Sequence, residues 1–169
     1  GIIATSGANA HGIFAQSAGG EQDALDPRFA YAPEVAFADL QDRGGNITIV
    51  IDGGVIVSGA GAHGIFAHSE GDDENGNINV TLEAEGVVRG GTGSGVGVRF
   101  QAGATNLLTN HGAIGAMGGI AGMAVFGDTG NETIDNFGYV VGSVDLGTGA
   151  NRFQNNADAL FDMGAKVAL

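Results

Sequence analysis

Residues 59–71, GAGAHGIFAHSEG, decide the fold, because residues 7–19, GANAHGIFAQSAG, nearly repeat them. The second copy lies 52 residues after the first. Internal repeats with periods of a few tens of residues are typical of solenoids, in which each unit buries its apolar face against the next. The repeat therefore predicts a stack of similar coils.

A shared local pattern continues this repeat toward the C-terminus. It consists of an alternating apolar run, a glycine, and an aliphatic residue two positions later. These anchor glycines are Gly53, Gly86, Gly112 and Gly138, and a further step of 26 residues leads to Gly164. Short alternating segments between glycine, asparagine and aspartate predict strands and turns. About five units stacked in register predict an all-β fold, a parallel β-helix, and the general preference for right-handed crossovers predicts its hand.

Equivalent residues of successive coils are expected to stack inside such a helix. The predicted aliphatic column contains Ile49 or Ile51, Leu82, Leu108, Ile134 and Leu160, and the predicted aromatic column contains Phe66, Phe100, Phe126 and Phe153. Asn110 and Asn136 occupy equivalent positions, two residues before an anchor glycine. Stacked side-chain amides can hydrogen bond along the axis, so we expect a structural role for these asparagines.

Residues 21–46, EQDALDPRFAYAPEVAFADLQDRGGN, interrupt the period with both prolines of the chain and two of its six basic residues. Pro33, the spacing of Asp39 and Arg43, and the two glycines that follow predict a short helix. Insertions into solenoids often form the binding face, and a flap over one side of a coil is an equal alternative. The residues expected to contact a partner are Asp26, Arg28, Phe29, Tyr31, Phe37 and Arg43.

The composition excludes several classes of function. Nineteen acidic against six basic residues give a net charge of -13, which disfavours binding to nucleic acid or to an anionic membrane. The absence of cysteine excludes disulfides and thiolate chemistry. No apolar run is long enough to span a membrane, so we expect no membrane insertion by this segment. The 33 glycines predict frequent tight turns.

Three groups of residues invite a metal-binding interpretation. His11 and His63 fall at the same repeat position and are expected to face each other on adjacent coils, with His68 nearby. Metal sites need three or four converging ligands, so turn histidines repeated with the coil are the preferred interpretation. Residues 71–77 and 127–135 resemble calcium loops, but each lacks an expected aspartate. We therefore expect no cofactor, with calcium at these two acidic turns as the alternative.

The sequence contains no recognisable catalytic constellation. Ser94 has flanking glycines at the wrong spacing for a nucleophile elbow and is predicted to be a turn residue. Carboxylates that one face of a β-helix could bring together, as in polysaccharide-cleaving enzymes, are Asp52, Glu83, Glu85 and Asp145. Only Arg89 and Arg99 could supply a basic group in the middle coils. We expect no enzymatic activity, and a carbohydrate-active lyase or hydrolase is the alternative.

The repeated AHGIFAxS motif, the N-x-G-x-I/V strings and the GxGxNRFxNN string near the C-terminus resemble passenger regions of bacterial autotransporters, the type V secreted proteins. The resemblance covers nearly the whole chain except the insertion. It implies a right-handed β-helical stalk on the surface of a Gram-negative bacterium or released from it, with residues 1–169 as a single segment of a longer passenger. It also implies a non-catalytic role in adhesion to a host surface protein or glycan, or in self-association and biofilm formation.

Overall fold

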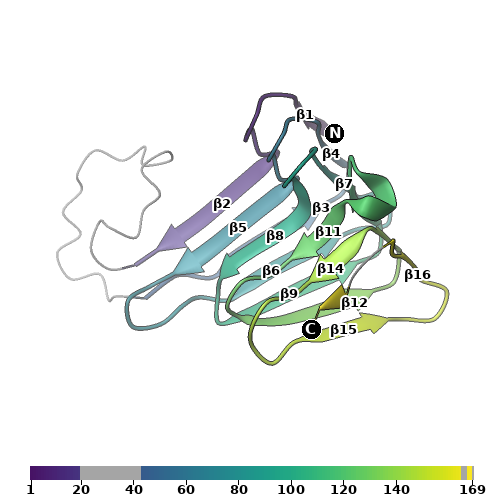
Figure 1. Ribbon diagram of the computed structural model, residues 1–169. Coiled ribbons are helices and arrows are strands. Elements are labelled where there is room, and N and C mark those ends of the chain that lie inside the picture. The colour runs from purple at the N-terminus through teal and green to yellow at the C-terminus, as the bar shows by residue number, and fades with distance from the viewer. Residues whose placement is uncertain (20–42, 165–166, 169) are drawn as a thin grey trace.

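The structure, a computed structural model, describes residues 1–19, 43–164 and 167–168. Its strands form three parallel sheets, in each of which a strand pairs with the equivalent strand of the next coil (Figure 1). This arrangement confirms a parallel β-helix of about five coils. The handedness stays a prediction. Among the described residues the only helical turn is the 3-10 turn η2 (Gly119–Ala121).

Each complete coil contributes one strand to each sheet. The first sheet contains β1 (Ile2–Thr5), β4 (Gly54–Val57), β7 (Val87–Gly90), β10 (Ala113–Ala116), β13 (Tyr139–Val141) and β16 (Leu160–Asp162). The second contains β2 (Ile13–Ala18), β5 (Ile65–Glu70), β8 (Val96–Ala102), β11 (Met123–Phe126), β14 (Ser143–Asp145) and β17 (Val167–Ala168). The third contains β3 (Ile47–Ile51), β6 (Ile78–Leu82), β9 (Thr105–Asn110), β12 (Asn131–Asn136) and β15 (Arg152–Asn155).

The strand register confirms four anchor glycines and corrects the fifth. Gly53, Gly86, Gly112 and Gly138 each precede equivalent residues of the first sheet. Gly164 is not equivalent to them, because Leu160 of β16 pairs with Tyr139 of β13. The prediction failed because the coils shorten along the chain. Equivalent residues that are joined by hydrogen bonds are separated by 33 residues, then 26, then 19.

The anchor positions require glycine because the coils approach each other closely there. A Cβ atom on Gly112 would lie 2.0 Å from the carbonyl oxygen of Gly86, and one on Gly138 would lie 2.2 Å from that of Gly112. Contacts this short are impossible without a shift of the backbone. The glycine periodicity in the sequence is therefore a record of coil stacking.

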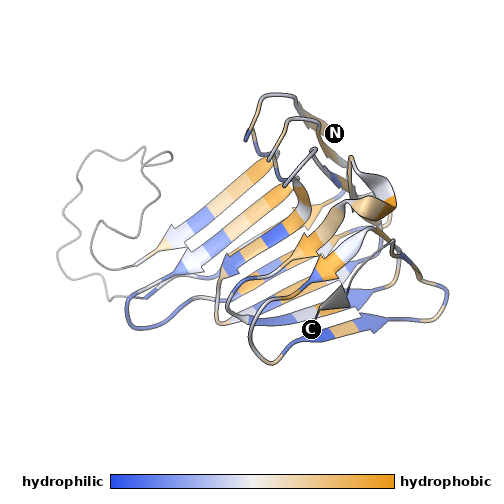
Figure 2. Ribbon diagram, viewed as in Figure 1, coloured by the Kyte–Doolittle hydropathy of each residue, from blue (hydrophilic) through white to orange (hydrophobic). Residues whose placement is uncertain are grey.

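The interior is filled by aliphatic columns, and the hydrophobic residues along the strands are visible in Figure 2. The column that runs through the third sheet consists of Ile49, Val80, Leu108, Ile134 and Phe153. The predicted positions of Ile49, Leu108 and Ile134 are correct. Leu82 belongs instead to the neighbouring inward column, and Leu160 lies in the first sheet.

Asparagines in the neighbouring column form the predicted amide ladder. Asn110 Nδ2 donates to Asn136 Oδ1 at 2.7 Å, and Asn136 Nδ2 donates to Asn155 Oδ1 at 2.7 Å. Each Oδ1 also accepts a hydrogen bond from the backbone N–H two residues later in the chain: Asn110 from Gly112, and Asn136 from Gly138. Each buried asparagine thus caps the turn out of its own strand and bonds to the next coil.

The predicted aromatic column is wrong. Phe66 and Phe126 pair with Arg99, whereas Phe100 pairs with Ala67 and points into the core. Phe100 is one residue further from Phe66 than the local coil spacing of 33. Since a slip of one residue moves a side chain to the opposite face of a strand, a nearly fixed distance from the anchor glycine does not place a phenylalanine on a given face. Phe153 lies on β15 of the third sheet.

The last residues of the predicted insertion belong to the coil. Arg43 forms a parallel bridge with Glu74, and Gly44 N donates to Glu74 O at 2.8 Å. Asn77 N donates to Asn46 Oδ1 at 2.8 Å. Residues 43–46 therefore stack on the next coil, and the boundary predicted at residue 46 is too late. The rest of the predicted helix lies outside the described residues.

Candidate functional site

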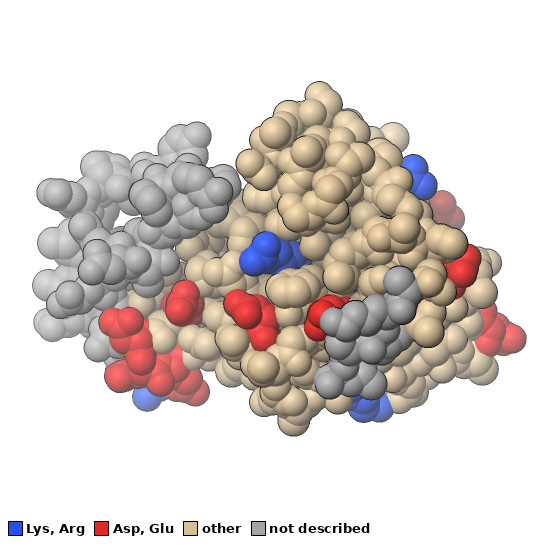
Figure 3. All heavy atoms as spheres, in the orientation of Figure 1, with Lys and Arg blue, Asp and Glu red and all other residues tan. Residues whose placement is uncertain are grey.

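The outward face of the second sheet has the most varied chemistry of the described coils. Its strands turn residues such as Ile65 and Ala67 into the core, so their neighbours face outward. One outward row consists of Phe14, Phe66, Arg99, Phe126 and Asp145. A second row contains Gln16, His68 and Gln101. Figure 3 shows basic atoms near the middle of this face, set back among uncharged atoms.

His11 and His63 stack on each other, as the repeat predicted. Their rings are 4.8 Å apart and inclined by 4°. The backbone N–H of His63 donates to His11 Nδ1 at 3.0 Å, and that of Val96 donates to His63 Nδ1 at 3.1 Å. Each imidazole thus accepts a hydrogen bond from the backbone N–H of the equivalent residue in the next coil. This contact explains why the histidine-containing motif repeats. Neutral imidazole has one acceptor nitrogen, so the proton of His63 lies on Nε2.

Arg99 lies beside His63 and between two phenyl rings. Its guanidinium carbon is 5.0 Å from the centre of the Phe66 ring and 5.4 Å from that of Phe126. Such cation–π contacts favour a cation that has lost part of its hydration. Nη1 is 3.3 Å from His63 Nε2, and Nη2 donates to Gln101 Oε1 at 3.4 Å, while the buried Nε has no hydrogen-bond partner.

Burial changes the proton affinities of both groups. It lowers the pKa of His63 to about 4, with further lowering by His11 and Arg99. Burial also lowers the pKa of Arg99, and the nearby Asp128 carboxylate acts in the opposite direction. His63 is therefore neutral at neutral pH, and Arg99 remains a cation because its ordinary pKa is so high. We call His63, Phe66, Arg99, Gln101, Phe126 and Asp128 the Arg99 cluster.

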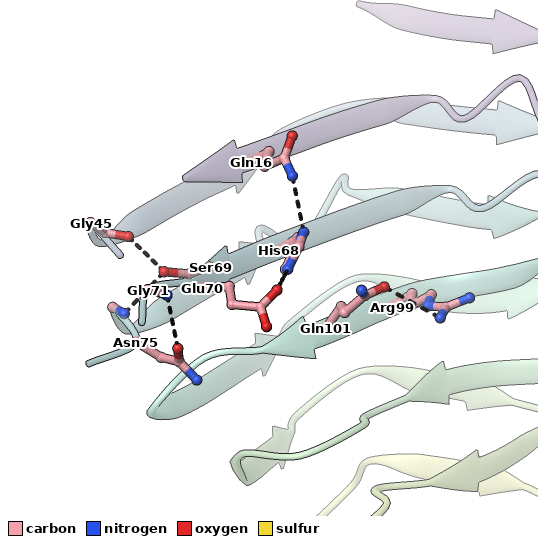
Figure 4. A network of polar contacts seen from close by, with 10 residues as sticks. Gln16, Gly45, His68, Ser69, Glu70, Gly71, Asn75, Arg99 and Gln101 are labelled. Carbon is pink, nitrogen blue, oxygen red and sulfur yellow. Dashed lines mark hydrogen bonds and ion pairs between the residues drawn. The ribbon is translucent and has the colours of Figure 1, made fainter. Parts of the chain in front are cut away.

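A second polar network lies further along the same strands (Figure 4). Gln16 Nε2 lies 3.2 Å from His68 Nδ1, and His68 Nε2 lies 2.8 Å from Glu70 Oε2. A histidine that a carboxylate orients could act as a base toward a nucleophile at its other ring nitrogen. In His68 this other nitrogen, Nδ1, faces the side-chain amide of Gln16 instead. The hydroxyl of Ser69 points the other way, donating to Gly45 O and accepting from Gly76 N. The network joins two coils.

The carboxylates considered for catalysis do not converge on one face. Asp52 and Glu83 occupy equivalent turn positions after β3 and β6, and Glu85 follows in the second of these turns. Asp145 lies on β14 of the second sheet, so the predicted grouping of all four is wrong. Ser94 lies in the turn between β7 and β8, as predicted.

The two acidic turns have different structures. In residues 71–77, Gly71 N donates to Asn75 Oδ1 at 3.1 Å. In residues 127–135, Glu132 turns inward and is fully buried, where its Oε1 accepts from Asn106 Nδ2 at 2.9 Å. Burial raises the pKa of Glu132, and its Oε2 has no hydrogen-bond partner. Within the described ranges, no three histidine, aspartate or glutamate residues gather as metal ligands.

Most of the predicted contact residues lie outside the described residues, namely Asp26, Arg28, Phe29, Tyr31 and Phe37. Arg43 is described and exposed, with its Nε 3.5 Å from Glu74 Oε2. The position of Arg99 in the aromatic row was not predicted from the sequence. Aligning Gly64 with Gly97 would have revealed it, because this places Phe66 on Arg99.

No helix in the described part of the chain is long and apolar enough to cross a membrane. Comparisons of the chain with models of protein families, with curated proteins and with solved structures found no match.

Proposed function

We propose that this chain is a non-catalytic β-helical segment of a surface-exposed or secreted bacterial protein that acts in adhesion. The partner is a host surface protein or glycan, or another copy of the same protein. The observation that carries the proposal is the outward face of the second sheet, where aromatic, imidazole, guanidinium and amide groups from successive coils lie together. Arginine and aromatic side chains are enriched at binding surfaces.

The resemblance of the AHGIFAxS repeat to autotransporter passengers supports the same proposal. In that class the segment would be displayed outside the outer membrane of a Gram-negative bacterium. A parallel β-helix is suited to this role because its coils hold outward side chains at fixed spacing along a rigid axis.

The test is adhesion of beads that carry the purified segment to epithelial cells and to extracellular matrix. A second set carries a variant in which residues 21–42 are replaced by a short glycine-serine linker, which leaves Arg43 and Gly44 in the coil. Adhesion by both sets would place the contact on the coils, and adhesion by the complete segment alone would place it on the insertion.

Two further measurements cover the remaining outcomes. Light scattering against protein concentration detects self-association. Incubation with acidic and neutral polysaccharides, with and without calcium, detects cleavage. Adhesion to none of the surfaces together with a monomeric state would refute the proposal, and so would cleavage of any polysaccharide.

A further inference from the structure

The Arg99 cluster contains more hydrogen-bond donors than acceptors. The N–H of Val96 occupies Nδ1 of His63, so the Nε2 nitrogen of His63 carries a hydrogen. This hydrogen faces Nη1 of Arg99, a second donor, at a distance of 3.3 Å. Two donors that face each other leave both without an acceptor. His63 is only 5% exposed, so an acceptor for this pair of donors has to sit against the half-exposed Arg99.

The positive charge of Arg99 is also without a direct counter-ion. The described residues place no carboxylate oxygen within 4.0 Å of the guanidinium, although the chain has a net charge of -13. Charges withdrawn from water are normally paired. Here the guanidinium is half-buried between Phe66 and Phe126 and makes only a long contact with Gln101. Asp128, the one carboxylate of the cluster, acts on the guanidinium without forming an ion pair with it, so the place of a directly bound anion is open.

We propose that the Arg99 cluster binds the carboxylate of an acidic sugar. One carboxylate oxygen accepts from the Nε2–H of His63 and from Arg99 Nη1, and the planar carboxylate matches the planar guanidinium. This inference rests on the proposed function and specifies its ligand class.

The charges around the cluster select the kind of anion. Asp128 is close enough to affect Arg99 electrostatically, and Asp145 continues the same outward row. These carboxylates and the negative field of the whole chain oppose a dianion such as phosphate or sulfate more strongly than a single carboxylate. Gln101 offers an amide, and Asp128 offers oxygens that can accept from sugar hydroxyls.

The experiment is a titration of the ¹⁵N-labelled segment with sodium glucuronate, followed by two-dimensional NMR. We expect saturable shifts of the amide signals of Val96, Phe66 and Arg99. Sodium acetate tests the carboxylate alone, glucose tests the neutral sugar, and sodium sulfate tests the dianion. We expect glucuronate to bind most tightly, acetate at least tenfold more weakly, and glucose and sulfate not measurably.

Arg99→Gln removes the cation and is expected to weaken glucuronate binding at least tenfold. Arg152→Gln is the matched control, because Arg152 is exposed on the third sheet and pairs with Asp135. It should bind glucuronate like the original chain. If Arg99→Gln does not give a dispersed spectrum, Arg99→Lys takes its place, since it keeps the charge but loses the planar fork and should still bind more weakly.

Other results of the titration overturn the inference. Absence of saturable shifts, equal shifts with glucose or with sulfate, or unchanged binding by the Arg99 variant would each refute it. Beads that adhere to cells while the segment ignores glucuronate would leave the proposed function intact. Glucuronate binding by a segment that is monomeric and adheres to none of the surfaces would refute the proposed function alone.

Discussion

Asn136 is the central member of the amide ladder, and its replacement by alanine tests whether the ladder holds the last coils together. Its side chain is fully buried. It accepts from Asn110 Nδ2 at 2.7 Å and donates to Asn155 Oδ1 at 2.7 Å. Its Oδ1 is also the acceptor for the N–H of Gly138 at 3.2 Å. Asn136→Ala removes these three interactions together with two longer ones, from Asn136 Nδ2 to the carbonyl oxygens of Gly138 at 3.3 Å and Leu160 at 3.2 Å.

The expected loss follows from these contacts. Two side-chain hydrogen bonds contribute about 1 kcal/mol each, and the buried N–H of Gly138, left without its acceptor, costs about 1–2 kcal/mol more. The free energy of unfolding should fall by about 3–4 kcal/mol. For a chain of this size the midpoint of thermal unfolding should fall by about 10 °C.

The measurement is urea unfolding followed by circular dichroism and by tyrosine fluorescence. Two probes are needed because a solenoid can lose its terminal coils before the rest unfolds. Asn155→Ala is the control, because Asn155 is exposed at the end of the same ladder and should lose no more than about 1 kcal/mol. Similar losses for the two variants, within about 0.5 kcal/mol, would refute the structural role of the ladder.

Two further substitutions test the coil contacts and the buried carboxyl group. Gly138→Ala would place a Cβ 2.2 Å from the carbonyl oxygen of Gly112 and should destabilise the fold by about 2 kcal/mol or more. Gly54→Ala is the control, because a Cβ there meets only Ile2 at 3.4 Å and should be tolerated. The midpoints of urea unfolding of the two variants are compared. Because burial raises the pKa of Glu132, the folded chain binds a proton more tightly than the unfolded chain, and its stability falls as pH rises above about 4.3. Glu132→Gln should therefore unfold at a higher temperature than the original chain at pH 7, and this difference should disappear at pH 3.5. An equal difference at both pH values would contradict a raised pKa of Glu132 in the folded chain.

The sequence predicted those features that depend on exact repetition. The 52-residue repeat placed His11 on His63, and the N-x-G pattern placed Asn110 on Asn136. Both predictions succeeded because a side chain that bonds to its equivalent in the next coil must recur in register. The asparagines also recur because their side chains cap the turns that the anchor glycines follow.

The sequence could not predict features that depend on the length of each turn. A constant period of 26 residues predicts an anchor at Gly164, but the last complete coil is shorter. The face of Phe100 was predicted wrongly because its distance from the anchor glycine is one residue longer than that of Phe66. The packing around Arg99 depends on three coils of unequal length, so no single period brings Phe66, Arg99 and Phe126 together.

The position of Arg99 between two phenylalanines allows a final test that separates packing from binding. If the guanidinium served only to fill the row, phenylalanine would serve as well, because it would continue the aromatic stack from Phe66 to Phe126. Arg99→Phe also removes a buried donor without a partner. We therefore expect an equal or higher urea midpoint together with loss of glucuronate binding. A residue that lowers stability but is needed for binding is selected by function. A lower midpoint with binding retained would instead show that Arg99 is a packing element of the coil.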